Sequence, residues 1–237
     1  MKAILVMPKS LMVLALLLAA LSSIIYFPSS DRILVIILAV ATALISDLIF
    51  TKVRGVPPFL MSAALVSGLI IGLLVSPSLP WYIPVVAATA AMGIKNFFRV
   101  GDNHIFNPAA SGLLVAHLIF NQHVSWWGVS WQQSILPVAI LLTPVLVSAY
   151  YLKRYSIILP FLLVYAILNR VIFDPTVIFF AIVMLPEPKT SPNELMPQIA
   201  FGSLVALGSS FILFADPLIT SLLLANLLFY LVKNFKL

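Results

Sequence analysis

The chain has 237 residues, of which 62% are hydrophobic and 8% are charged, with a formal net charge of +6 and no cysteine. Soluble domains contain about 25% charged residues, so this composition excludes a soluble globular protein and predicts an integral membrane protein. The lack of cysteine excludes disulfides and thiolate-bound iron–sulfur clusters within this chain. The positive charge is assigned to loops beside membrane spans rather than to nucleic-acid binding.

Apolar segments follow one another along the whole chain and predict an all-α membrane protein, a single transmembrane domain of about ten segments. In order, they are Leu11–Phe27, Ile33–Phe50, Pro58–Val75, Trp81–Phe97, Pro108–Phe120, Ile135–Leu152, Ile157–Phe173, Pro175–Leu185, Pro197–Phe214 and Pro217–Val232. The first is interpreted as a retained span because its apolar part is long for a signal peptide, which stays the alternative. The fifth and eighth are too short to cross a bilayer and predict half-helices.

The basic residues predict the orientation of these segments. With the N-terminus in the cytoplasm, only Arg32 and Arg170 of the 13 lysines and arginines fall on the outer side. Positively charged loops collect on the cytoplasmic side of membrane proteins. The prediction is therefore a protein integral to the cell membrane with both termini cytoplasmic.

One stretch of the sequence occurs twice. Residues 107–120 and 216–229 each begin with an Asn-Pro or Asp-Pro pair, and they share Pro, Leu, Ala and Phe at matching positions. Asn and Asp are good helix N-caps, and Pro suits the first helical position. His117 and Asn226 occupy equivalent places in the two copies. The match predicts an internal duplication with a capped helix at each start.

The duplication predicts two inverted five-helix repeats with interrupted helices, in residues 1–121 and 134–237. Each repeat has an odd number of segments, so the second copy must lie upside down relative to the first. In transport proteins built this way, the functional site lies at the interface of the repeats, where short Gly- or Pro-interrupted segments meet.

Four motifs resemble one family: S-A-A-L-V-S-G-L-I-I-G-L-L-V-S-P (Ser62–Pro77), H-I-F-N-P-A-A (His104–Ala110), P-E-P-K-T-S-P (Pro186–Pro192) and L-L-A-N-L-L (Leu223–Leu228). They resemble motifs of the NqrB/RnfD membrane subunits, which belong to the sodium-pumping NADH:quinone oxidoreductase and the Rnf complex. The resemblance implies ten helices, a bound flavin and other subunits of such a complex as partners.

Two departures from the family bear on the flavin. Pro186-Glu187-Pro188 replaces the family's Thr-Asp-Pro. The S-G-A-T-like motif whose threonine carries covalent FMN in the family is absent, and the matching loop, Asn121–Gln133, contains no threonine. Covalent FMN is therefore not expected. The prediction is a non-covalent flavin, FMN or riboflavin, between the repeats.

The residues predicted to hold this flavin are Lys95, Arg99, Asn107, Pro108, Glu187, Thr190 and Asp216. Free N–H groups at a helix start attract an anion or a flavin carbonyl edge, and basic residues can grip a phosphate. Structural interpretations stay open for each. The Asn-Pro and Asp-Pro pairs, including Asp174, could be simple caps. Lys95 and Arg99 could be inner-rim charges, and Glu187 could pair with Lys189 or with lipid headgroups.

Three residues are candidates for an ion pathway: Asp47, His117 and Asn226. Ionisable and polar groups inside apolar helices face protein or a water-filled cavity. The alternatives are an ion pair between Asp47 and Lys52, and a helix–helix hydrogen bond for His117 and Asn226.

The histidines and tryptophans provide weaker signals. His104, His117 and His123 lack the spacing of metal ligands, so no metal site is predicted, and no catalytic residue either. Trp126, Trp127 and Trp131 predict an outer interfacial aromatic belt, with a quinone or flavin stacking site as the alternative.

The preferred hypothesis is a membrane subunit of an Rnf/Nqr-like redox-driven ion-translocating electron transport complex. It would not be an enzyme by itself, because the sequence contains no soluble flavin, NAD or iron–sulfur domain. The alternatives are a stand-alone inverted-repeat channel or transporter for a small solute, and a purely structural subunit that anchors redox partners.

Overall fold

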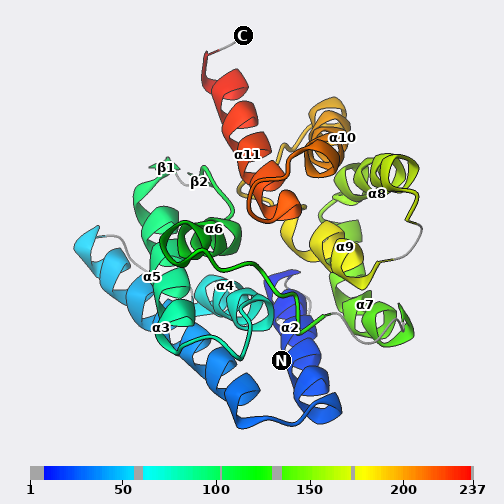
Figure 1. Cartoon of the computed structure of the whole chain (residues 1–237). Helices are drawn as coiled ribbons and strands as arrows, with labels where there is room; N and C mark the ends of the chain where they lie inside the picture. Colours follow the sequence, from blue (N-terminus) through cyan, green and yellow to red (C-terminus); the bar gives the residue numbers. More distant parts are fainter. Residues whose placement is uncertain (1–7, 56–60, 102, 130–134, 172–173, 236–237) are drawn as a thin grey trace.

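Helices account for almost all of the regular structure in this computed structural model, which describes residues 8–55, 61–101, 103–129, 135–171 and 174–235 (Figure 1). Their bounds are α2 (Pro8–Tyr26), α3 (Ser30–Val53), α4 (Met61–Leu74), α5 (Tyr82–Phe97), α6 (Pro108–Phe120), α7 (Ile135–Tyr151), α8 (Tyr155–Asn169), α9 (Pro175–Phe179), the π-helix η1 (Phe180–Met184) that continues it, α10 (Leu195–Phe211) and α11 (Pro217–Phe235). Each predicted segment therefore has a helical counterpart, although Pro58 and residues 172–173 lie outside the described residues.

The segment between α5 and α6 contains the strands of the described part of the chain. β1 (Arg99–Val100) and β2 (Asn103–His104) pair antiparallel, with Arg99 opposite His104. Gly101 takes a positive φ of 56° at the turn, which glycine adopts without strain. The hairpin joins the end of α5 to the start of α6.

The helices are shorter than the predicted segments imply. Among the described residues, α3, with 24 residues, is the one helix long and apolar enough to cross a membrane by length and composition. The fifth and eighth segments are short as predicted: α6 has 13 residues, and α9 and η1 have 5 each. Helices α4 and α8, with 14 and 15 residues, are short as well. At 1.5 Å per residue, 15 residues span only about 22 Å.

The two halves of the chain pack in the same order. In the first half α5 lies against both α3 and α6, and in the second half α10 lies against both α8 and α11. The halves meet where α2 packs on α7 and where α6 packs on α11 (Figure 1).

Two glycines allow the closest helix contacts. A Cβ atom on Gly112 of α6 would lie 2.2 Å from the carbonyl oxygen of Ala87 on α5. A Cβ on Gly202 of α10 would lie equally close, at 2.2 Å, to the carbonyl oxygen of Ile157 on α8. Small residues let helix backbones approach in this way in membrane proteins. Any larger side chain at either position would push the helices apart.

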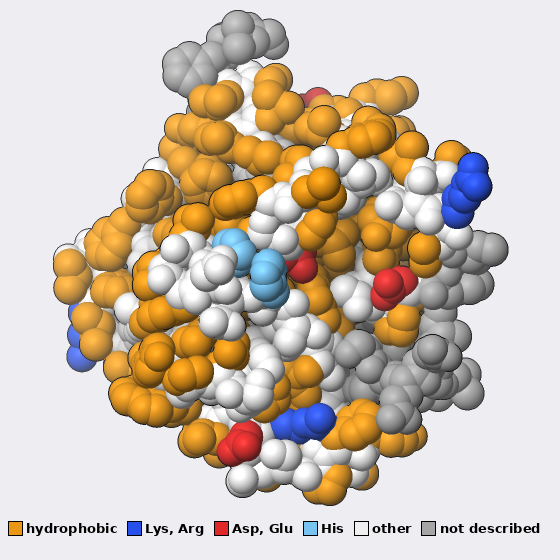
Figure 2. Space-filling view, viewed as in Figure 1, with side chains coloured by type: hydrophobic (Ala, Val, Ile, Leu, Met, Phe, Trp, Pro, Cys, Tyr) orange, Lys and Arg blue, Asp and Glu red, His pale blue; other side chains and the backbone are white. Residues whose placement is uncertain are grey.

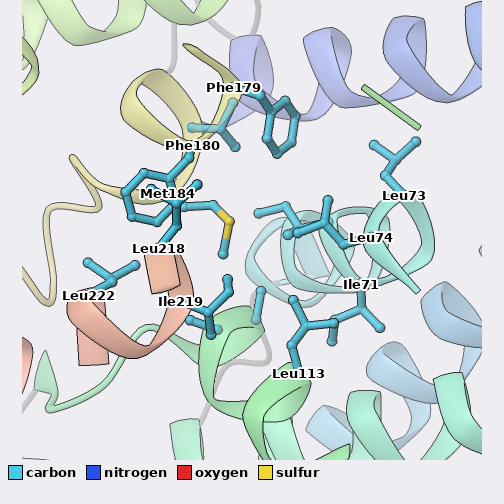
Figure 3. Close-up of a cluster of buried hydrophobic side chains, with 14 of the residues drawn as sticks. Ile71, Leu73, Leu74, Leu113, Phe179, Phe180, Met184, Leu218, Ile219 and Leu222 are labelled. Atoms are coloured by element: carbon cyan, nitrogen blue, oxygen red, sulfur yellow. The ribbon is translucent and has the colours of Figure 1, made fainter. Parts of the chain in front are cut away.

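An apolar cluster fills the space where the halves meet (Figure 3). Helices α4, α6, η1 with α9, and α11 all contribute side chains that point toward one another. The labelled members are buried: Ile71, Leu73, Leu74, Leu113, Phe179, Phe180, Met184, Leu218, Ile219 and Leu222. The face shown in Figure 2 is also rich in hydrophobic side chains, and charged side chains are few there.

Candidate functional site

Asn107 caps α6 and also ties it to the second half of the chain. Its Oδ1 accepts a hydrogen bond from the backbone N–H of Ala110 at 3.0 Å, which confirms the predicted N-cap. Its Nδ2 donates to the carbonyl oxygen of Met184 at 3.2 Å, at the end of η1. The side chain is only 3% exposed. Both ends of the amide are therefore used by protein, as a buried amide requires.

Asn226 of α11 completes this connection. Its Oδ1 accepts from the backbone N–H of Asn107 at 3.0 Å, and its Nδ2 donates to the carbonyl oxygen of Thr190 at 3.0 Å. The residue is 1% exposed. The structural alternative for Asn226, a hydrogen bond between helices, is present, and it joins α11 to the start of α6 and to the loop after η1. For His117 the bond is local, because its Nδ1 lies 3.1 Å from the carbonyl oxygen of Gln122. We call Asn107, Asn226 and the carbonyls of Met184 and Thr190 the amide hub.

His104 extends this region toward the hairpin. Its Nε2 lies 3.0 Å from Oε1 of Glu187, so the partner of Glu187 is a histidine that the sequence had not assigned. Thr190 Oγ1 makes a longer contact, 3.4 Å, to the other carboxylate oxygen. The His104 ring is buried, and its Nδ1 has no hydrogen-bond partner in the described part of the chain. Arg99, opposite His104 in the hairpin, places a cation on the same edge.

Arg154, which directly precedes α8, fixes the loop that follows Glu187. Its guanidinium donates to Ser191 Oγ at 3.3 Å, to the carbonyl oxygen of Pro192, and to Asn193 Oδ1 at 2.7 Å. Burial lowers the pKa of Arg154 below its usual value, because the charged form loses hydration. The three acceptors compensate for that loss, and the loop is held against the start of α8. No sequence pattern indicated this role beyond the basic pair at 153–154.

Asp216 caps α11 as predicted, at a second and separate place. Its Oδ1 accepts from the backbone N–H of Ile219 at 3.0 Å, the same pattern as at Asn107. Its Oδ2 accepts from Nε1 of Trp126 at 2.8 Å. Ten residues of helix, about 15 Å, separate Asp216 from Asn226. Asp216 therefore cannot belong to the same binding site as Asn107 and Glu187.

The predicted belt of tryptophans is wrong for Trp126, which is buried. It packs edge-on against Phe179 and Phe180 and reaches Asp216. Trp127 donates from Nε1 to the carbonyl oxygen of Gly72 at 3.0 Å, at the end of α4. Trp131 lies outside the described residues. The loop from 121 to 129 folds inward because its N–H groups pair with the last carbonyls of α4.

The ring of His117 contacts His123 and Phe214, with ring centroids 5.3 and 5.9 Å apart. Asn226, its counterpart in the sequence repeat, contacts Asn107 instead. The start of α6 therefore contacts Asn226 in the middle of α11, and its last turn contacts Phe214, just before α11 begins. The two helices consequently lie antiparallel. No group of three or more His, Asp or Glu side chains in the described ranges could hold a metal ion.

Asp47 lies in a buried charge cluster of its own. Its Oδ2 is 2.7 Å from Lys95 Nζ, and its Oδ1 accepts from Asn96 Nδ2 at 2.7 Å. Arg54 donates to Asn96 Oδ1 at 3.1 Å. The ion pair predicted with Lys52 is wrong, because the partner is Lys95 of α5. This pair also engages Lys95, which the sequence had offered for a cofactor phosphate.

The structure therefore divides the predicted site residues into three places. Arg99, Asn107, Pro108, Glu187 and Thr190 gather with Asn226 at one end of α6. Lys95 lies with Asp47, and Asp216 lies with Trp126. The sequence did not predict that His104 is the partner of Glu187. The available signal was its place in the H-I-F-N-P-A-A motif, as a polar residue close to the helix cap.

A sequence model of the NQR2, RnfD, RnfE family matches residues 6–134. The chain belongs to this family. The match covers more than half of the chain, including the hairpin and α6, and confirms the resemblance inferred from the motifs. The motifs around Glu187 and Asn226 lie outside the matched residues.

Two relatives are named as subunits of the ion-translocating oxidoreductase complex. The one from Aliivibrio salmonicida (strain LFI1238) is 29% identical over 106 residues, covering 43% of this chain and 30% of the relative. The one from Shewanella sediminis (strain HAW-EB3) is 30% identical over 95 residues, covering 38% of this chain and 27% of the relative. The chain thus matches less than a third of the length of these relatives. Family and composition together confirm a membrane location.

Proposed function

We propose that the chain is a membrane subunit of an Rnf/Nqr-like redox-driven ion-translocating electron transport complex. The observation that carries this proposal is the amide hub, built on the family's Asn-Pro turn. Family membership and the names of the relatives support the same function. Because the chain contains no cysteine, any iron–sulfur centre of such a complex must come from other subunits, which are its partners.

We propose further that residues 1–121 and 134–237 are inverted repeats with both termini cytoplasmic. The equal packing order of the two halves, the matching caps at Asn107 and Asp216, and the antiparallel contact of α6 with α11 support this arrangement. The distribution of basic residues supports the orientation. The repeats would then meet at the apolar cluster of Figure 3, with the amide hub at its cytoplasmic end.

The hub end is the better place for a non-covalent flavin. A neutral imidazole that donates from Nε2 to Glu187 has an acceptor at Nδ1, and a buried acceptor without a partner requires a donor. The imide N–H of a flavin is such a donor, so the residues fit this group. His104, Glu187, Thr190 and Arg99 would hold it, while the side chain of Asn107 positions the loop. A bound flavin would supply one- and two-electron transfer.

For the ion pathway, Asp47 remains the proposed buried acid, with Lys95 as its counter-charge. Lys95 and the side-chain amide of Asn96 each bind one of the two carboxylate oxygens of Asp47. Loss of the Lys95 contact would free one oxygen for a cation. Asp47 would then bind Lys95 and a passing cation in turn.

The test of the flavin assignment is the visible spectrum of the protein purified from membranes, followed by filtration after denaturation. Flavin bands that pass the filter are expected. Apoprotein is then titrated with riboflavin and FMN by fluorescence quenching. His104→Phe and Glu187→Gln should each weaken binding about tenfold, or about 1.4 kcal/mol. His123→Phe, at the opposite end of α6, is the matched control and should bind as the wild type does.

A colourless preparation that binds neither flavin in the titration would overturn the flavin assignment. A preparation that associates with no redox partner and speeds solute entry into liposomes would replace the proposed function with the transporter alternative. Thermal melts of each variant separate loss of binding from loss of folding.

A further inference from the structure

A hollow lies away from the amide hub, beside the end of α2 and the start of α3. It has a volume of about 560 Å³ and lies between the turn that joins α2 to α3 and the turn that joins α4 to α5. Trp127 closes it from the side. Small-molecule sites measure about 300–1,000 Å³, so this hollow is large enough for a lipid headgroup.

Arg32 is the cation of this hollow, and aromatic rings fix its position. The guanidinium carbon lies 4.7 Å from the ring centroid of Phe27 and 5.3 Å from that of Trp127. Nη1 donates to the carbonyl oxygen of Phe27 at 2.9 Å. Cation–π contacts and one hydrogen bond hold the group, and the planar fork carries four further N–H donors that match the oxygens of a phosphate.

An acid and three serine hydroxyl groups, those of Ser29, Ser76 and Ser78, also belong to the lining. Asp31, next to Arg32 in the first turn of α3, is exposed. Within the described residues these neighbours form no ion pair with each other. Ser76 and Ser78 contribute hydroxyl groups whose oxygens are 2.9 Å apart. The hollow therefore presents one cation, one anion and hydroxyl groups, which complement a ligand that carries both a phosphate and an ammonium group.

The surroundings place this hollow at a membrane–water interface. Tyr26 at the end of α2 and Trp81 at the start of α5 are each 64% exposed at the same helix ends. Exposed Tyr and Trp collect where the hydrocarbon region meets water. Figure 2 shows an acidic and a basic side chain beside each other near the α2–α3 turn, at the bottom of the view, with apolar side chains around them.

We propose that this hollow binds the headgroup of a zwitterionic phospholipid with a primary ammonium group. The phosphate binds the free N–H groups of Arg32, and the ammonium group binds the carboxylate of Asp31. Charge-assisted hydrogen bonds are about twice as strong as neutral ones, so the two contacts together select this headgroup. An anionic headgroup without an ammonium group meets the carboxylate of Asp31 and is disfavoured. This site is separate from the flavin assignment and independent of it.

The test is native mass spectrometry of the full chain in mild detergent, with equal amounts of phosphatidylethanolamine, phosphatidylcholine and phosphatidylglycerol. The wild type should retain phosphatidylethanolamine, and Arg32→Gln should lower its retention about tenfold. Arg170→Gln, the same change at the other outer arginine, is the control and should retain it. Asp31→Asn, at an exposed position, should remove the preference over phosphatidylcholine while phosphate-dependent retention persists.

Equal retention in Arg32→Gln and Arg170→Gln would overturn the proposal, and so would a preference for phosphatidylglycerol. Inorganic phosphate at millimolar concentration is the second probe. If it displaces the lipid completely, the hollow is a free-phosphate site rather than a lipid site. If Arg32→Gln alters the thermal melt, Asp31→Asn decides the outcome.

Discussion

The turns at Asn107 and Asp216 are alike in sequence and in capping, yet their remaining contacts differ. Each accepts the N–H of the third residue after it at 3.0 Å. The Nδ2 of Asn107 also donates to the buried carbonyl of Met184, and the backbone N–H of Asn107 donates to the side chain of Asn226. At Asp216 the second oxygen accepts from Trp126.

This difference follows from the hydrogen-bond donors and acceptors that each side chain carries. Asn carries a donor and an acceptor, so it can satisfy a helix start and a carbonyl at once in a dry site. Asp only accepts, so it can lie beside an indole N–H but not beside a carbonyl. The two ends of the apolar cluster are therefore not interchangeable, even though the helices that carry them match in sequence.

The largest expected effect comes from removing the second amide. Asn226→Leu leaves the N–H of Asn107 and the carbonyl of Thr190 without partners in a buried site. Each such group costs about 1–3 kcal/mol, so the free energy of unfolding should fall by about 3 kcal/mol. Its counterpart His117→Leu removes the hydrogen bond to the Gln122 carbonyl and two ring contacts from a half-buried residue, and should cost about 1 kcal/mol. Equilibrium unfolding in detergent measures both, and equal losses would contradict the special place of Asn226.

Exchanging the two caps sharpens the comparison. Asn107→Asp keeps the cap but turns a carboxylate oxygen toward the carbonyl of Met184, and should cost about 2–3 kcal/mol. Asp216→Asn keeps its cap equally well and loses only the contact to Trp126, at a cost of about 1 kcal/mol. The same unfolding measurement decides. If both exchanges were neutral, capping alone would explain the two turns.

The smallest effect concerns the indole N–H. Trp126→Phe should lower the free energy of unfolding by about 1 kcal/mol, because it keeps an aromatic ring and loses the bond to Asp216. A double-mutant cycle with Asp216→Asn should show a coupling of about 0.5 kcal/mol or more. Trp127→Phe is the control, since its N–H binds Gly72, and its effect should add to that of Asp216→Asn.

Much of the helical plan could be predicted, and the tertiary partners could not. The Asn-Pro and Asp-Pro pairs determined where α6, α9 and α11 begin, because a cap and a proline at the first position are local signals. The burial of Trp126 could not be predicted: a tryptophan in a loop suits an interface by composition, and only the fold of residues 121–129 onto α4 turns it inward.

The ion-pair partner of Asp47 could not be predicted for a similar reason. Asp47 and Lys52 are close in sequence, but Lys95 comes from a helix that packs across α3. Hydrogen bonds between distant segments depend on how each helix is rotated about its axis and on the angle at which helices cross. The apolar pattern of one sequence determines neither. His104 and Glu187 meet for the same reason.

The sequence alone determined that this is a helical membrane protein of a recognisable family, because hydrophobicity, caps and motifs act over a few residues. Only the tertiary structure decided which polar groups meet. In so apolar an interior, each buried donor must find an acceptor, and the position of every acceptor depends on how the helices pack.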